Sequence, residues 1–215
     1  NDGDMDIVVV EFRRQSTSLS PATNFYTIHI YENDGAANPS FTKSTIQRTY
    51  AGGWRIDVAD INRDGNLDIV VGGEGGYPLM GVIWLCNECG SNTWTPYQIG
   101  RGDGGASDMR LADMDGDGDL DVISSGQSQG SGFSWYENTG SYHENTAWPK
   151  EQIDSPAPVP YAIDAGDLDN DGDLDFVGST ANYTSIFAAR VQDNFISWYE
   201  NDGAADPSWT DSVIK

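Results

Sequence analysis

The stretch that decides the fold is Asp113-Met114-Asp115-Gly116-Asp117-Gly118-Asp119-Leu120-Asp121, in which an aspartate occupies every second position. The same nine-residue pattern returns at 167–175 and 60–68, and residues 1–6 carry the end of another copy. Carboxylates spaced this closely repel one another unless a cation lies among them. Calcium accepts six to eight oxygen ligands, and a glycine permits the sharp turn that folds a loop around such an ion.

These loops predict up to four calcium ions, one per loop, with the first loop truncated. A helix–loop–helix site is excluded, because the twelfth positions are Val71, Ser124 and Gly178 rather than glutamate. The alternative is a solvated acidic turn without metal, and the recurrence of the pattern favours calcium. We expect side-chain ligands from loop positions one, three, five and nine and a backbone carbonyl from position seven. The candidate metal-binding residues are Asp2, Asp4, Asp6, Asp60, Asn62, Asp64, Asn66, Asp68, Asp113, Asp115, Asp117, Asp119, Asp121, Asp167, Asp169, Asp171, Asp173 and Asp175.

The loops belong to a longer internal repeat. The loop glycines Gly3, Gly65, Gly118 and Gly172 are separated by 62, 53 and 54 residues. Two further motifs keep step with them: a Trp-Tyr-Glu-Asn type motif and a segment running from an aromatic residue to an isoleucine five positions on. Each unit therefore holds short strands joined by Gly, Asn, Asp and Ser turns, and helical periodicity is absent.

This pattern predicts an all-β chain, a β-propeller built of four-stranded antiparallel blades. The expected blades span approximately 1–46, 47–99, 100–153 and 154–214, with three strands in the first and four in each of the others. The first unit lacks its first strand and half of its loop, so we expect the chain to be an excerpt of a larger propeller. Trp84, Trp135 and Trp198 share one repeat position and are expected to fill the core between blades.

The Asp-rich loop, the Ile/Val strand after it and the Trp-Tyr-Glu-Asn-Asp-Gly turn at 198–203 resemble the FG-GAP repeat, an integrin-α-like, VCBS-type propeller repeat. The resemblance covers essentially the whole chain. It implies a calcium-stiffened propeller, usually of seven blades, in secreted or surface proteins that serve adhesion, partner or carbohydrate binding, or support of an attached enzyme. In the loop at 60–68, asparagine replaces aspartate at positions 62 and 66, as Asn62 and Asn66, which implies a weaker negative electrostatic field at that site.

Charge and composition narrow the function classes. The formal net charge is −23, and four calcium ions would reduce it only to −15, which argues against nucleic acid and anionic membranes as partners. No apolar run is long enough to span a bilayer. His29 and His143 lie in different units without a nucleophile placed beside either, so enzymatic chemistry is not expected. The favoured function is a calcium-stabilised extracellular module for protein–protein binding, scaffolding or cell adhesion.

Two alternatives remain open: a lectin-like propeller, and an accessory domain of a secreted carbohydrate-active or phosphoester-cleaving enzyme. Partners would be a protein or glycan at a surface or in an extracellular matrix. Long connections near 11–24 and 180–194 are candidate binding loops, because insertions on a rigid scaffold often carry binding sites. Their candidate contact residues are Phe12, Arg13, Arg14, Tyr183, Phe187 and Arg190, and the alternative is an uninvolved surface insertion.

Cys86 and Cys89 lie close together in a turn. A local disulfide is the favoured interpretation in an oxidising compartment. A redox dithiol would sit near a βαβ unit, and a zinc site would need a second pair of ligands, neither of which the sequence provides.

Overall fold

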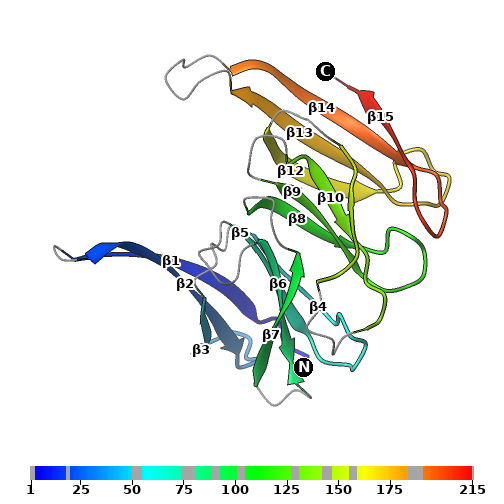
Figure 1. Ribbon diagram of the computed structural model, residues 1–215. Coiled ribbons are helices and arrows are strands. Elements are labelled where there is room, and N and C mark those ends of the chain that lie inside the picture. Colours follow the sequence, from blue (N-terminus) through cyan, green and yellow to red (C-terminus); the bar gives the residue numbers. More distant parts are fainter. Residues whose placement is uncertain are drawn as a thin grey trace.

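The computed structural model describes residues 3–17, 20–49, 55–73, 81–88, 93–100, 105–126, 131–141, 147–154, 159–183 and 191–214. Within these residues, fifteen antiparallel strands form one three-stranded and three four-stranded sheets, which follow one another along the chain. Figure 1 shows these sheets stacked face to face in an open arc. The predicted all-β architecture of blade-like sheets, with a three-stranded first unit, is confirmed.

Strand order within every sheet follows the chain, so each sheet is a simple meander. The first sheet contains β1 (Ile7–Thr17), β2 (Ser20–Asn33) and β3 (Phe41–Thr49), and the second β4 (Arg55–Ala59), β5 (Asp68–Gly73), β6 (Gly81–Asn87) and β7 (Trp94–Gly100). The third contains β8 (Ala106–Ala112), β9 (Asp121–Gly126), β10 (Phe133–Tyr136) and β11 (Lys150–Gln152), and the fourth β12 (Val159–Gly166), β13 (Asp175–Tyr183), β14 (Val191–Asn201) and β15 (Trp209–Val213).

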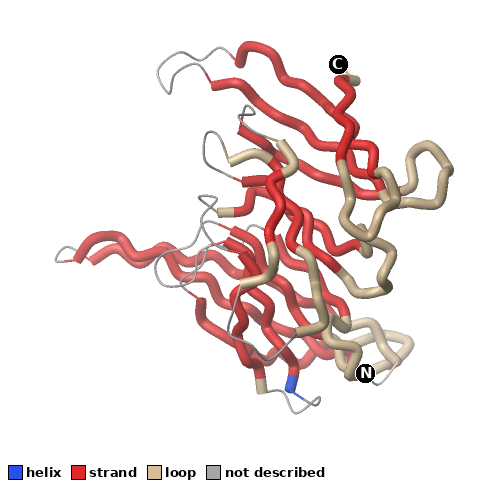
Figure 2. The backbone as a smooth tube through the Cα atoms, turned by 45° about the vertical axis from the view of Figure 1, so that its right-hand side comes forward, coloured by secondary structure: helices blue, strands red, loops and turns tan. Residues whose placement is uncertain are grey.

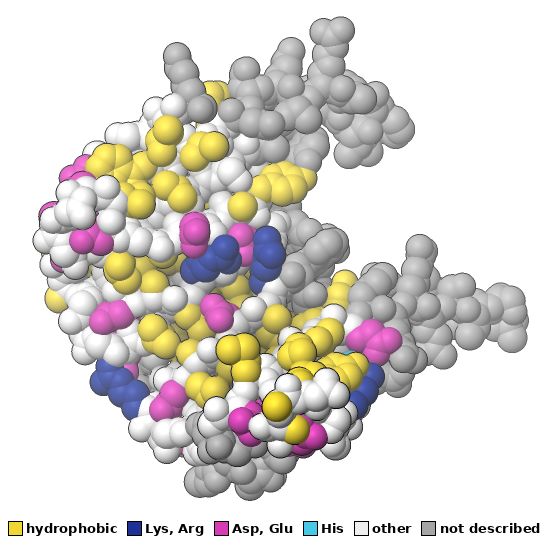
Figure 3. Space-filling model, turned by 180° about the vertical axis from the view of Figure 1, so that it is seen from behind, with side chains coloured by type: hydrophobic (Ala, Val, Ile, Leu, Met, Phe, Trp, Pro, Cys, Tyr) yellow, Lys and Arg dark blue, Asp and Glu magenta, His cyan; other side chains and the backbone are white. Residues whose placement is uncertain are grey.

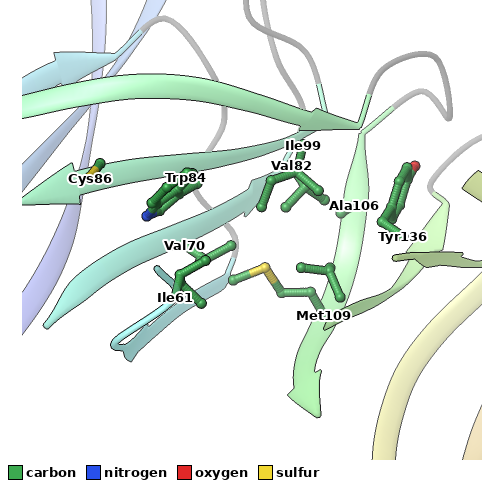
Figure 4. Close-up of a cluster of buried hydrophobic side chains, with 10 residues drawn as sticks. Ile61, Val70, Val82, Trp84, Cys86, Ile99, Ala106, Met109 and Tyr136 are labelled. Atoms are coloured by element: carbon green, nitrogen blue, oxygen red, sulfur yellow. The ribbon is translucent and has the colours of Figure 1, made fainter. Parts of the chain in front are cut away.

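The core lies between sheets rather than in one central mass. Successive side chains of a strand point to opposite faces, and the consecutive apolar residues of β5 therefore meet both the first and the third sheet, which explains why β5 is buried along its whole length. Between the second and third sheets, Trp84 and Val82 of β6 pack with Met109 of β8 and Tyr136 of β10 (Figure 4). Each interface therefore joins consecutive repeats and depends on both of them.

Aromatic rings fill the interface between the third and fourth sheets. The Phe176 and Tyr199 rings stack with centroids 4.4 Å apart, and Phe133 meets Phe176 edge-on at 5.5 Å. Trp84 and Trp135 are almost fully buried, as the sequence predicts, and Trp198 of the last sheet is half-buried. Trp84 and Trp135 are packing residues, because they belong to the hydrophobic clusters between sheets, whereas Trp198 lies on the last sheet outside these clusters.

The predicted long loops at 11–24 and 180–194 are wrong in part, because strands extend through much of both segments. Strands β1 and β2 stay paired from Ile7↔Tyr31 to Thr17↔Ser20, and β13 and β14 from Phe176↔Tyr199 to Tyr183↔Val191. β-Branched and aromatic residues in these stretches favour extended backbone, and continued pairing satisfies its N–H and C=O groups. The insertions are therefore projecting hairpins.

The two sides of the stacked sheets carry different connections. Figure 2 shows the Asp-rich connections, drawn as loops, along one side of the stacked sheets, and Figure 1 shows the β1–β2 hairpin projecting from the opposite side. Within the described residues there is no helix of the length and apolarity needed to cross a bilayer.

Candidate metal centre

Each complete Asp-rich loop joins the first two strands of its sheet. Residues 60–68 connect β4 to β5, residues 113–121 connect β8 to β9, and residues 167–175 connect β12 to β13. The sixth residue of each loop has a left-handed backbone, with φ of 87° at Gly65, 91° at Gly118 and 105° at Gly172. Residues that carry a side chain rarely adopt this backbone conformation, so glycine is the residue that lets the loop turn back on itself.

The first three alternating aspartates converge in the third and fourth sheets. One ligand atom from each of Asp113, Asp115 and Asp117 lies within 4.8 Å of the other two, and the same holds for Asp167, Asp169 and Asp171. Three negatively charged oxygens at such distances are the ligand type that calcium prefers. The structure therefore brings together positions one, three and five of these two loops.

Backbone N–H groups inside the loops hold these carboxylates in place. In the third sheet, Asp117 N donates to Asp115 Oδ1 (3.1 Å), and Asp119 N donates to Asp117 Oδ1 (2.7 Å). In the fourth sheet the corresponding bonds join Asp171 N to Asp169 Oδ1 (3.1 Å) and Asp173 N to Asp171 Oδ1 (3.0 Å). Such bonds fix the side-chain direction and leave further carboxylate lone pairs for a cation.

The ninth residue of each complete loop is a buried clamp. Its carboxylate accepts one bond from the backbone N–H of loop position two and another from the backbone N–H of an asparagine at or just after the end of the third strand. The bonds join Asp68 to Ile61 N (3.2 Å) and Asn87 N (2.7 Å), Asp121 to Met114 N (3.1 Å) and Asn138 N (2.8 Å), and Asp175 to Leu168 N (3.2 Å) and Asn201 N (2.9 Å). Position nine thus ties the loop to its sheet, and a metal bond there remains a prediction.

The asparagine at the end of the Trp-Tyr-Glu-Asn motif also links successive sheets. Asn201 Nδ2 donates to Leu174 O of its own loop (3.0 Å) and to Met114 O of the preceding loop (2.7 Å). Asn138 Nδ2 does the same with Leu120 O (3.2 Å) and Ile61 O (3.4 Å). Our sequence reasoning missed this role, although the recurrence of asparagine at a fixed distance from each loop was a signal for it.

The loop at 60–68 is held by more internal bonds than the other two. Both carboxylate oxygens of Asp60 accept backbone bonds, from Asp64 N (3.0 Å) and Gly65 N (2.9 Å). The amide groups of Asn62 and Asn66 both donate to Asp64, at 3.3 Å and 2.9 Å. Amide donors here replace part of the charge compensation that a cation would supply at an all-aspartate loop, in keeping with the weaker field expected from the sequence.

Burial raises the pKa of several carboxylates in these loops. Desolvation is the main cause that raises the pKa of Asp121 to about 7, and backbone hydrogen bonds from Asn138 and Met114 oppose it. Desolvation also raises the pKa of Asp115, with the charges of Asp117 and Asp113 adding to the effect. A divalent cation at these loops would reverse both effects, because it favours the charged form.

An ion pair connects neighbouring loops. Arg63, at position four of the second loop, places Nε 2.9 Å from Asp119 Oδ1 of the third. Arg63 has a left-handed backbone, with φ of 57°. The pair reduces the negative charge at position seven, the position from which the sequence predicts a carbonyl ligand rather than a side-chain ligand.

Comparison with known families agrees with this arrangement of loops and sheets. The model of the FG-GAP-like repeat matches residues 1–71 and 113–178, well over half of the chain. The chain belongs to the FG-GAP-like repeat family. A search of curated proteins found no match. The matched segments include the loops at 60–68, 113–121 and 167–175, so the repeat that the sequence suggested is confirmed.

The first FG-GAP-like loop is described from Gly3 onward, and Asp2 lies outside the described residues. Asp6 Oδ1 accepts the backbone N–H of Asn33 at 2.8 Å, which reproduces part of the clamp of the other loops. Asp4 lies directly beside Gly35, where a β-carbon would come within 2.3 Å of its carboxylate. Whether this loop holds an ion stays a prediction.

The other predicted residues of this FG-GAP-like chain are only partly placed. Phe12, Arg13, Arg14 and Tyr183 lie on hairpin strands, but their side chains, and all of Phe187 and Arg190, lie outside the described residues. Cys86 is buried in the core between the second and third sheets, and Cys89 lies outside the described part, so their disulfide stays a prediction.

One of the two histidines lies in the described part. His29 is buried, with Nε2 at 2.9 Å from Glu11 Oε2 and Nδ1 at 3.0 Å from Thr45 Oγ1. These contacts join the three strands of the first sheet and indicate a structural role. His143 lies outside the described residues.

Proposed function

We propose that the chain is a calcium-stabilised propeller segment that serves as an extracellular binding or scaffold module. The observation that carries the proposal is the convergence of three carboxylates in each of two loops. Among the described residues, no arginine or lysine forms an ion pair with these six groups. Extracellular fluids supply calcium in the millimolar range in which sites of this class fill.

The cation would act through the scaffold rather than through chemistry. Each loop is tied to its own sheet by the position-nine carboxylate and to a neighbouring sheet by the asparagine amide. An ion that fixes the loop would therefore fix the angle between consecutive sheets. We infer that this keeps the surface of the module rigid for binding, and we assign it no catalytic step.

The projecting hairpins are the proposed partner surface. Strands β1 and β2, and strands β13 and β14, extend to the side of the sheets opposite the loops (Figure 1), and Phe12, Arg13, Arg14 and Tyr183 lie on them. Phe187 and Arg190 follow β13 in the sequence and lie outside the described residues. Arginine and aromatic residues are enriched in protein interfaces. The larger exposed aromatic residues in the described part, Phe41 and Tyr161, lie on different sheets, so a protein partner is favoured over a sugar.

Calorimetric titration of chelator-treated protein with calcium tests the proposal. We expect two to four bound ions, and stabilisation of about 1 to 3 kcal/mol per site at about 10 mM calcium if dissociation constants lie between about 10⁻⁴ and 10⁻³ M. The variant Asp115→Asn should lose one site. Its control is Asp211→Asn, the same charge change on an exposed residue of β15, which should leave every site intact. Absence of heat and of any rise in melting temperature would disprove the calcium part of the proposal.

A partner screen addresses the binding part. Binding to extracellular proteins that is weakened by Arg13→Ser and Arg14→Ser together would support the hairpin surface. Binding to a glycan array with the same dependence would instead assign the module to carbohydrate recognition.

A further inference from the structure

Positive charge is scarce in this chain, so the place of each basic side chain matters to the local electrostatic field. The sequence contains 11 lysine and arginine residues against 34 aspartate and glutamate residues. On the face of the molecule shown in Figure 3, the basic side chains form a few separate groups with acidic side chains nearby. Among the residues of the three complete Asp-rich loops, Arg63 is the only basic one.

Arg63 occupies position four of its loop, where the backbone is left-handed in all three complete loops. The φ angle at this position is 57° at Arg63, 73° at Gly116 and 67° at Asn170. Glycine and asparagine adopt this conformation more readily than other residues do. Backbone preference therefore does not account for an arginine at this position, and the contacts of its side chain have to.

The side chain of Arg63 reaches the next loop along the chain. Its Nε lies 2.9 Å from Oδ1 of Asp119, at position seven of the loop at 113–121, and the Asp119 side chain is only 15% exposed. The guanidinium also lies against Gly118, where an added β-carbon would come within 2.7 Å of Arg63 Nη2. Asp119 N in turn donates to Oδ1 of Asp117, one of the three converging carboxylates. The positive charge therefore lies directly beside the candidate calcium site of another sheet.

The loop at 167–175 has the same five aspartates but a different neighbour. Position four of the preceding loop is Gly116, which has no side chain to reach across. Within the described part of the chain, Asp173, at position seven, forms no ion pair and lies beside Gly203 of its own sheet. The two all-aspartate loops thus differ in whether an arginine from the preceding sheet contacts them.

We propose that Arg63 sets the calcium affinity of the loop at 113–121 by lowering the negative electrostatic field there, and that the loop at 167–175 lacks this control. The inference rests on the proposed calcium function and adds the regulation of one site by a residue of another. A positive charge opposes the binding of a divalent cation, and its pairing with Asp119 offsets one carboxylate charge of the loop. Because the effect is electrostatic, added salt weakens it.

Calcium titration of the isotope-labelled whole chain, followed by NMR, tests the proposal. The backbone amides of Gly118 and Gly172 report the two loops separately in one sample. At low ionic strength, Arg63→Gln should tighten calcium binding reported by Gly118 about two- to fivefold and leave the Gly172 curve unchanged. Arg63→Lys keeps the charge and should stay near the affinity of the original chain. The control is Lys43→Gln, the same charge change on an exposed residue of β3, which should leave both curves unchanged.

Two glycine positions separate charge from backbone strain. Arg63→Gly removes the charge and the left-handed side-chain residue together, and it should match Arg63→Gln. Gly116→Arg installs an arginine at position four of the loop at 113–121, where an added β-carbon meets no atom within 4 Å. This variant should weaken the calcium binding reported by Gly172 by a similar factor of about two to five. Tightening by Arg63→Gly without tightening by Arg63→Gln would assign the effect to strain and overturn the proposal.

The outcomes also separate this inference from the proposed function. If calcium shifts both glycine amides but Arg63→Gln leaves the Gly118 midpoint unchanged, the role of Arg63 is wrong and the calcium function stands. If neither amide responds up to about 10 mM calcium, both are wrong. A change at Gly118 that stays the same between about 0.05 M and about 0.5 M salt would contradict an electrostatic cause.

Discussion

Replacement of Asn201 by alanine tests how successive sheets are held together. The Asn201 amide donates to Leu174 O (3.0 Å) and Met114 O (2.7 Å), and its Oδ1 accepts the N–H of Gly203 (3.0 Å). The side chain is buried, so water cannot replace these bonds easily. At about 1 kcal/mol net per bond, the variant should lose about 3 kcal/mol of unfolding free energy, and orphaned buried carbonyls can add to this loss.

Asn33 provides the matched control, because it occupies the same repeat position in the first sheet. Its amide donates to Met5 O (3.2 Å), and its Oδ1 accepts the N–H of Gly35 (3.1 Å), both at exposed positions. Asn33→Ala should therefore cost about 1 kcal/mol or less, since water can replace these bonds.

Urea denaturation at saturating calcium and in chelator measures both variants. With an m-value of about 3 kcal/mol/M, Asn201→Ala should lower the midpoint by about 1 M and Asn33→Ala by about a third of that. Equal losses in the two variants would refute the reasoning, because the bond to the neighbouring sheet would then contribute nothing.

Three further predictions concern charged groups. Desolvation raises the pKa of Asp121 from an ordinary 3.8 to about 7, so the folded state binds more protons than the unfolded state between these two pH values. The cation-free protein should therefore lose stability as the pH rises from about 4 to about 7, which thermal melts in chelator would measure. Asp108 is buried against two arginines, so Asp108→Asn should cost about 3 kcal/mol in urea denaturation, whereas Asp119→Asn, which loses one half-exposed pair, should cost less than about 1 kcal/mol. The Ser208 hydroxyl is the main cause that lowers the pKa of Asp202, so Ser208→Ala should raise that pKa toward its ordinary value in an NMR titration.

Each of these has a contrary outcome. If stability in chelator rises over the same pH range, the raised pKa is not coupled to folding. Equal destabilisation by the two asparagine substitutions would mean that burial does not strengthen the inner-strand pairs. An unchanged carboxyl titration in the serine variant would show that the backbone N–H groups alone set its pKa.

Local sequence was sufficient for the strands, the turns and the grouping into repeats. Alternating apolar residues specify strands by themselves, and Gly118 specifies a turn because its φ of 91° suits few other residues. The sequence also identified the loop carboxylates, because they occupy every second position within nine consecutive residues. The hairpins at 11–24 and 180–194 were misread, since the pairing that extends a strand depends on the partner strand, as in Arg13↔Phe25.

The sequence by itself determined the repeat, the family and the acidic loops, because each of these depends on a pattern of a few neighbouring residues. Only the tertiary structure decided which sheets touch and through which atoms. Asn201 and Met114 are far apart in the chain, as are Arg110 and Asp164, yet each pair meets between consecutive sheets. The geometry of stacking, and not any local preference, sets these contacts, so the links between repeats became visible only in three dimensions.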